Sequence, residues 1–114
     1  MTGVQTCALP ISIGLYHDLA LGSDRHGADG WRFQEVLALG ADCGAPPDAF
    51  APEGQNWGFS PADPLRLRES GYQYVIELFR NNLRYGGAIR LDHVMALFRL
   101  FWIPRGLQIG RAHV

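Results

Sequence analysis

Two short stretches of alternating apolar and polar residues, far apart in the chain, are typical of β-strands. They cover residues 13–18 and 88–92. In the second stretch the apolar side chains lie on one face, and Arg90 and Asp92 lie on the other, because successive strand side chains point in opposite directions. The pattern therefore predicts two strands, the second with two charged groups on one face.

A helical pattern precedes the second strand. Asp63 is a good N-cap and Pro64 suits the first helical position, so a helix is expected over 65–84. Its apolar positions recur at helical spacing: Tyr72, Val75, Ile76, Phe79 and Leu83. Gly71 weakens the middle and marks a break into two pieces. Gly86–Gly87 are expected to end the helix as a C-cap.

The remaining segments have weaker patterns. Residues 22–30 are small and polar and predict a loop, whereas 31–39 favour either a short helix or irregular chain. Residues 44–61 are rich in Pro and Gly and predict a long loop without helix or interior strand. Residues 94–102 favour a helix or a buried mixed segment that stops near Pro104. The order predicts an α/β fold with a parallel sheet.

Composition narrows the function classes. With 114 residues, 47% of them hydrophobic, and a net charge of −1, the chain offers no electrostatic basis for binding nucleic acid or a membrane surface. No apolar run approaches the ~20 residues that cross a bilayer. Cys43 is the one cysteine outside the N-terminal segment, which suggests a thiol in a reducing, cytoplasmic compartment. The histidines lack metal-ligand spacing and no phosphate-binding glycine loop is present, so neither metal nor cofactor is expected.

Arg90 and Asp92 are the strongest candidates for chemistry. Side chains two apart on a strand point the same way, and a guanidinium favours the ionised form of a neighbouring carboxylate, as a carboxylate nucleophile requires. Asp92 also lies at the C-terminal end of its strand, the place where α/β barrels hold catalytic groups. The alternative is structural: Asp92 caps a helix that starts near Val94, and Arg90 is its partner. Spacing alone leaves both open.

The long loop suggests sugar binding. Trp57 offers an apolar face, and Gln55 and Asn56 beside it offer amide donors and acceptors. Sugars present an apolar C–H face ringed by hydroxyl groups, which such a surface suits. The alternative is that Trp57 only packs within the loop.

Four motifs in order resemble the 4-alpha-glucanotransferases, the amylomaltases or disproportionating enzymes of glycoside hydrolase family 77. They are Gly44–Asp48, Gly54–Gly58, Gly87–Met95 and Arg99–Pro104, within a similarity that runs from about Ile13 to Gly106. The resemblance implies a (β/α)8 TIM barrel of which this chain holds roughly strands 3 to 4, with the intervening loop and helices. It also implies α-1,4-glucans (maltooligosaccharides, maltodextrins) as partners and a retaining double displacement.

The resemblance further implies roles for single residues. Asp92 matches the nucleophile, and Arg90 matches the arginine that holds it. His93 matches a donor to the sugar, and Asp18 matches an aspartate that contacts sugar hydroxyls. The loop residues Gln55, Trp57 and Phe50 match positions along the acceptor glucan. Ala49 stands where some members have Tyr, so one stacking contact is not expected here.

The family's acid/base glutamate and its stabilising aspartate have no match before Gln108. Retaining chemistry needs two carboxylates ~5–5.5 Å apart, so the chain alone is expected to be inactive. Two alternatives remain: a related α-glucan hydrolase of the same clan, which the Gln-Asn-Trp loop argues against, and a non-catalytic maltodextrin-binding fragment.

Both ends of the chain resemble translated sequencing-library adapter. Thr2–Ile11 and Ile109–Val114 can be encoded by the same DNA read in opposite directions. We therefore expect residues 1–11 and 109–114 to be non-native, and residues 12–108 to be the glucanotransferase-like segment.

Overall fold

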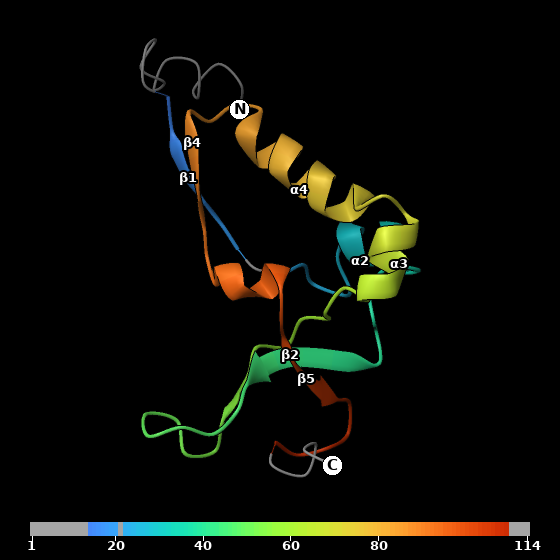
Figure 1. Ribbon diagram of the computed structural model, residues 1–114, viewed down its shortest axis with the longest axis vertical. Coiled ribbons are helices and arrows are strands. Elements are labelled where there is room, and N and C mark those ends of the chain that lie inside the picture. The colour runs from blue at the N-terminus through green and yellow to red at the C-terminus, as the bar shows by residue number, and fades with distance from the viewer. Residues whose placement is uncertain (1–13, 21, 110–114) are drawn as a thin grey trace.

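The computed structural model describes residues 14–20 and 22–109 as a mixed α/β structure with one parallel and one antiparallel sheet (Figure 1). The elements in chain order are β1 (Tyr16–Leu19), α2 (Ala28–Arg32), β2 (Ala41–Ala45), β3 (Gln55–Asn56), α3 (Pro64–Glu69), α4 (Gln73–Leu83), β4 (Ala88–Leu91), the 3-10 helix η1 (Val94–Leu97) and β5 (Phe101–Pro104). The prediction for residues 1–11 and 110–114 lies outside the described residues.

The two predicted strands form the parallel sheet. β1 pairs with β4 in parallel, and Asp18 lies opposite Arg90 in the register. Helix α4 precedes β4 in the chain and lies alongside the pair in Figure 1. The predicted strand–helix–strand order is therefore confirmed. Ile89 and Leu91 are half-buried while Arg90 and Asp92 are exposed, so the predicted alternation of faces is confirmed as well.

The start and the break of the helical region are confirmed. The Asp63 carboxylate accepts hydrogen bonds from the backbone N–H groups of Leu65 and Arg66, at 2.9 and 3.3 Å, and so caps α3. The helix then stops, because Gly71 (φ +68°) and Tyr72 (φ 61°) both adopt the left-handed region. A new helix, α4, begins at Gln73.

Several details of the helical prediction are wrong. Ile76 and Leu83, expected on the apolar face, are each 41% exposed. Tyr72 is 51% exposed, because the break at Gly71 turns it out of the helical face, and Tyr74 (5% exposed) is buried in its place. Tyr74 packs with Val36 and Leu37 in the main apolar core. Gly86 is not a left-handed cap: a Cβ there would lie 2.3 Å from the His17 ring, so this glycine allows close packing instead.

The antiparallel sheet was not predicted. It has the strand order β3-β2-β5. Residues 44–61 were expected to hold no interior strand, which is wrong for Gly44 and Ala45 at the end of the central strand β2, whereas β3 is an edge strand. A Cβ on Gly44 would lie 1.9 Å from the carbonyl oxygen of Gln55, so glycine lets β3 approach β2. Ile103 of β5 and Cys43 of β2 are fully buried in this sheet.

Residues 94–102 take a mixed form, as one of the two alternatives expected, but the expected burial is wrong, because Met95, Leu97 and Phe98 are exposed. Helix η1 covers four residues, and the chain then enters β5, which includes Pro104. Pro104 lies at the end of an edge strand, where the missing N–H costs no ladder hydrogen bond. In the part of the chain that the structure describes, no helix is long and apolar enough to span a bilayer.

Candidate active site

Asp18, Arg90 and Asp92 form one charged cluster at the end of the parallel pair. Asp18 and Arg90 are opposite each other on neighbouring strands, and Asp92 follows two residues after Arg90. The parallel register therefore places all three side chains on one face. The Arg90 guanidinium donates to Asp18 Oδ2 at 2.6 Å through Nη1 and to Asp92 Oδ1 at 3.4 Å through Nη2.

This cluster is open to solvent. Its side chains are 62% (Asp18), 51% (Arg90) and 57% (Asp92) exposed. The hydrogen bond to Asp18, then the negative charges of Asp18 and Asp92, raise the pKa of Arg90. The expected pairing of Arg90 with Asp92 is present, but Asp18 is the nearer partner.

His93 continues directly from Asp92 and has an unusual backbone. Its φ of 47° and ψ of 56° lie in the left-handed region, which a non-glycine residue adopts at a cost of about 1–2 kcal/mol. Such conformations gather at functional sites, where the surroundings hold them. His93 is exposed, and its ring meets the Trp57 ring edge-on with centroids 5.0 Å apart.

The loop brings Trp57 to the charged cluster. The Trp57 backbone N–H donates to the Cys43 carbonyl at 2.9 Å, and its indole N–H donates to Gln55 Oε1 at 3.0 Å. Phe59 stacks against the half-buried indole at 6.1 Å between centroids. Trp57 therefore packs within its loop and also contacts His93. Its role in sugar binding stays a prediction.

Phe50 does not join this group. It lies between β2 and β3 and is 98% exposed, with its N–H bonded to Asp48 Oδ1 at 2.8 Å. Gln55 is exposed on β3 and orients the indole of Trp57. Of the seven candidate residues, the structure brings together Asp18, Arg90, Asp92, His93, Trp57 and, through Trp57, Gln55.

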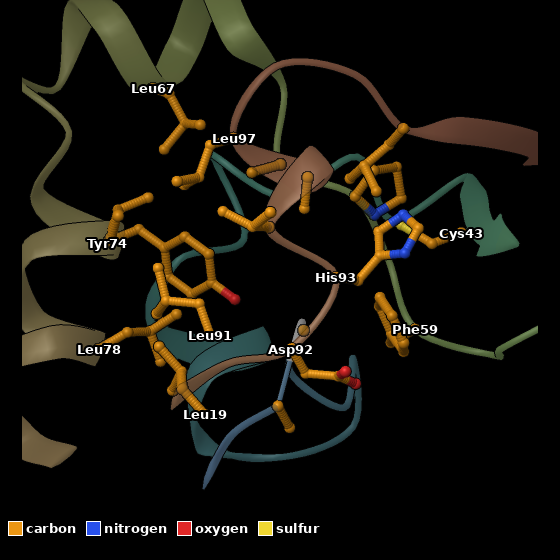
Figure 2. A pocket seen from close by; sticks show the side chains of 18 of the residues that line it. Leu19, Cys43, Phe59, Leu67, Tyr74, Leu78, Leu91, Asp92, His93 and Leu97 are labelled. Atoms are coloured by element: carbon orange, nitrogen blue, oxygen red, sulfur yellow. The ribbon is translucent and has the colours of Figure 1, made fainter. Parts of the chain in front are cut away.

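An apolar cavity of about 120 Å³ lies behind the charged cluster (Figure 2). It is lined mostly by apolar side chains, among them Leu19, Leu91 and Tyr74, and Asp92 and His93 also line it. Figure 2 shows the Asp92 carboxylate directed away from Leu91 and Tyr74. A sugar needs many polar partners, which this lining does not offer. The cavity is therefore the space between sheet and helices, and the exposed face of the cluster is the candidate site.

Sequence reasoning missed two charged residues beside the loop. Arg25 and Asp42 form an ion pair with side chains 8% and 16% exposed. The sequence offered one signal for this ion pair: Asp42 stands between small apolar residues in 41–45, and a charge buried there needs a partner of opposite sign. Within residues 14–20 and 22–109, no group of three or more His, Cys, Asp or Glu side chains could hold a metal ion.

The parallel strand–helix–strand unit with charged groups at its strand ends is that of an α/β enzyme. The chain belongs to the 4-alpha-glucanotransferase family, glycoside hydrolase family 77, whose family model matches residues 1–113. The resemblance noted in the sequence is therefore confirmed.

Relatives support the same assignment. A 4-alpha-glucanotransferase of Mycobacterium tuberculosis is 48% identical over 102 residues, which are 90% of this chain and 14% of the relative. The crystal structure of amylomaltase from Corynebacterium glutamicum has a TM-score of 0.82 at 46% identity, and the match covers 88% of this chain and 14% of that one. Amylomaltase from Streptococcus agalactiae, solved in complex with acarbose, has a TM-score of 0.77 at 21% identity, covering 83% and 20%. This chain thus spans a small part of the proteins that it matches.

Proposed function

We propose that this chain is a segment of a longer 4-alpha-glucanotransferase, holding the nucleophile and part of the acceptor-binding loop. In this proposal β1 and β4 are the third and fourth strands of a (β/α)8 barrel. Support comes from their parallel pairing and from the charged groups at their ends, where barrel enzymes hold catalytic groups. Residues 12–108 are the native part of the segment, and a cytoplasmic location belongs to the same proposal.

The exposed Asp18–Arg90–Asp92 cluster is the observation that carries the proposal. In the first step the Asp92 carboxylate attacks the anomeric carbon of an α-1,4-glucan, and the glycosidic bond breaks as the leaving oxygen takes a proton. In the second step an acceptor hydroxyl attacks the glycosyl ester, loses its proton and frees Asp92. Arg90 orients the free carboxylate through its hydrogen bond to Asp92 Oδ1 at 3.4 Å.

The proton must come from a residue outside this chain. Asp18 is already engaged by the Arg90 guanidinium, from which it accepts a charge-assisted hydrogen bond at 2.6 Å, and so it is assigned to binding. We assign Asp18 and His93 to the sugar at the cleavage point, both being exposed beside Asp92. The segment by itself is then expected to be inactive, because loss of the general acid/base typically lowers the reaction rate by about 10²–10⁴-fold.

The loop explains transfer in place of hydrolysis. Trp57 and Gln55 lie beside His93 and present an aromatic ring with an amide, a surface that can hold an acceptor glucan. Phe50, exposed between β2 and β3, extends the same loop away from the cluster. A bound acceptor, held in position, intercepts the glycosyl-enzyme before water does.

The test uses the full-length protein that carries this segment, incubated with maltotriose. We expect a ladder of longer maltooligosaccharides, and we expect Asp92→Asn to lower its formation on the order of 10⁴-fold. Glu69→Gln, an exposed carboxylate on α3, is the matched control and should keep the ladder. Free glucose with no ladder would indicate a hydrolase, and an active Asp92→Asn variant would remove Asp92 from its role.

Trp57→Ala tests the loop. The variant should raise the ratio of hydrolysis to transfer, because the acceptor loses its contact while Asp92 remains. Trp31→Ala is the control, since Trp31 is 79% exposed on α2 and has no ring contact with His93. Both reactions are measured in one maltotriose digest. New reducing ends measure hydrolysis, and the longer maltooligosaccharides measure transfer. An unchanged ratio in Trp57→Ala contradicts the role of the loop.

A further inference from the structure

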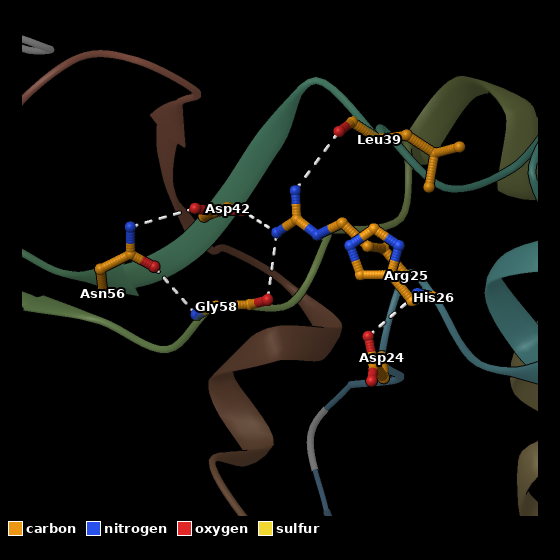
Figure 3. A network of polar contacts seen from close by, with 7 residues as sticks. All are labelled: Asp24, Arg25, His26, Leu39, Asp42, Asn56 and Gly58. Carbon is orange, nitrogen blue, oxygen red and sulfur yellow. Dashed lines mark hydrogen bonds and ion pairs between the residues drawn. The ribbon is translucent and has the colours of Figure 1, made fainter.

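The loop that carries Trp57 is anchored by one arginine from a distant part of the chain (Figure 3). Arg25 forms an ion pair with Asp42 of β2, and the same Nη2 group donates to the Gly58 carbonyl at 3.0 Å. Its Nη1 group lies 3.5 Å from the Leu39 carbonyl. The guanidinium thus joins three segments. A nearly buried ion pair is costly to form unless further hydrogen bonds satisfy its charges, and here they do.

Asn56 completes the anchor on the other side of the loop. Its side-chain amide donates to Asp42 Oδ2 at 3.1 Å, and its side-chain oxygen accepts from the Gly58 N–H at 2.8 Å. Gly58 has φ +76°, a left-handed conformation that suits glycine, and in this conformation its N–H meets Asn56 while its carbonyl meets Arg25. Both neighbours of Trp57 are therefore fixed by the same network.

The fixed backbone determines where the Trp57 ring lies. With Asn56 and Gly58 held, the Trp57 N–H reaches the Cys43 carbonyl and the ring lies against His93 at 5.0 Å between centroids. Arg25 itself takes no part in these ring contacts. It acts at a distance, through Asp42 and the backbone on either side of Trp57.

We propose that Arg25 and Asp42 are positioning residues that set the acceptor-binding loop against His93 and so favour transfer over hydrolysis. This inference rests on the proposed function. It goes beyond it because Arg25 and Asp42, which are not among the proposed sugar-contacting residues, would determine whether a sugar or water accepts the glycosyl group. Only the two-residue strand β3 gives this Pro- and Gly-rich loop a regular hydrogen-bond ladder, so the Arg25–Asp42 anchor is needed as well to hold the aromatic ring beside His93.

Arginine is needed for this task because of its shape. The planar guanidinium reaches a carboxylate and two carbonyl groups at once, whereas lysine is a point charge on a flexible stem. Arg25→Lys therefore keeps the charge beside Asp42 but loses the simultaneous contacts to Gly58 and Leu39. It is a sharper change than Arg25→Ala, which leaves Asp42 without any partner.

The experiment compares Arg25→Lys with wild type in the full-length protein that carries this segment. We expect transfer to fall about three- to tenfold, the size of one or two lost hydrogen bonds, with a raised KM for the acceptor and hydrolysis within about twofold of wild type. In protein labelled with 5-fluorotryptophan, the ¹⁹F resonance of Trp57, assigned by its loss in Trp57→Phe, should shift or broaden. Arg32→Lys is the control: Arg32 forms an exposed ion pair with Glu77 at 2.8 Å, and both readouts should stay unchanged.

An Arg25→Lys variant with the wild-type transfer-to-hydrolysis ratio and an unmoved Trp57 resonance overturns the proposal. If Arg25→Lys does not fold, Asn56→Ala takes its place, because Asn56 is exposed and its side chain links Asp42 to Gly58. A smaller change of the same sign is then expected, and no change in ratio and resonance again overturns the proposal. A wild-type protein that forms no ladder rejects the proposed function instead. The resonance of Trp57 in the variants then decides whether Arg25 positions it.

Discussion

His93 combines a strained backbone with a ring contact, and two substitutions separate these contributions. The residue adopts φ 47° and ψ 56°, and its ring lies 5.0 Å from the Trp57 ring between centroids. His93→Ala and His93→Gly both remove the imidazole. Only the glycine variant also removes the steric penalty of the left-handed conformation. We predict that glycine is the more stable of the two replacements at this position.

The expected difference follows from these values. Both variants lose the ring pair, about 0.5–1.5 kcal/mol. Compared with alanine, glycine avoids the left-handed penalty of roughly 1–2 kcal/mol. It also raises the chain entropy of the unfolded state, which destabilises the fold by about 0.5–1 kcal/mol. The net advantage over alanine is therefore about 0.5–1 kcal/mol. At 1.36 kcal/mol per factor of ten, this makes local opening roughly two- to fivefold rarer.

Hydrogen exchange of peptides that cover residues 88–99, in the full-length protein, measures this opening locally. The glycine variant should be better protected than the alanine variant by roughly that two- to fivefold factor. Transfer activity should fall equally in both, because both lack the ring. Equal or weaker protection in His93→Gly would refute the strained conformation. Activity retained by one variant alone would show that the backbone, and not the imidazole, serves the reaction.

Three further predictions concern the cap, the thiol and the anchor. Asp63→Ala should destabilise α3 by about 1 kcal/mol, seen as faster exchange of its first turn, whereas Asp63→Asn keeps the cap and the protection. Burial, and after it the charge of Asp42, raises the pKa of Cys43 to about 12. Iodoacetamide at pH 8 should therefore label Cys43 only in denaturant. Labelling of Cys43 in the folded protein, measured by peptide mass, would contradict this. Burial alone would raise the pKa of Asp42, but hydrogen bonds from Arg25 and Asn56 with the charges of Arg25 and Arg105 outweigh it and lower the pKa. The stabilisation from Asp42 is thus present above about pH 3.9 and lost as pH falls below it, and an acid titration of loop exchange should show this loss in wild type but not in Asp42→Asn.

The sequence predicted those features that depend on near neighbours. Asp63 before Pro64 located a helix start, because a cap acts on the N–H groups two and three residues further along the chain. Gly71 located the break, because one left-handed residue is enough to end a helix. The alternation around Arg90 placed its side chain and that of Asp92 on one face, because strand period is a property of the strand itself.

Features that depend on distant partners could not be predicted in this way. β2 contains no β-branched residue and is a strand because Ile103 of β5 and the backbone of β3 lie against it. Asp18 is the nearer partner of Arg90, but the two are 72 residues apart and meet only through the register of β1 with β4. Arg25 gives no local signal at all, since its partners come from two distant segments, Leu39 and Asp42 in one and Gly58 in the other.

The pairing of β1 with β4 has a consequence for how the protein is made. During synthesis β1 leaves the ribosome long before β4. A contact between residues 72 apart does not stabilise the fold until the intervening chain has been ordered, because closing that long loop costs chain entropy. Asp18 is meanwhile a lone carboxylate on an unmatched strand edge. A slip of one residue in the final pairing would turn it to the opposite face from Arg90. We therefore expect the charged cluster to form late in folding. Its ion pair between Asp18 and Arg90 forms only when β1 and β4 pair in the correct register.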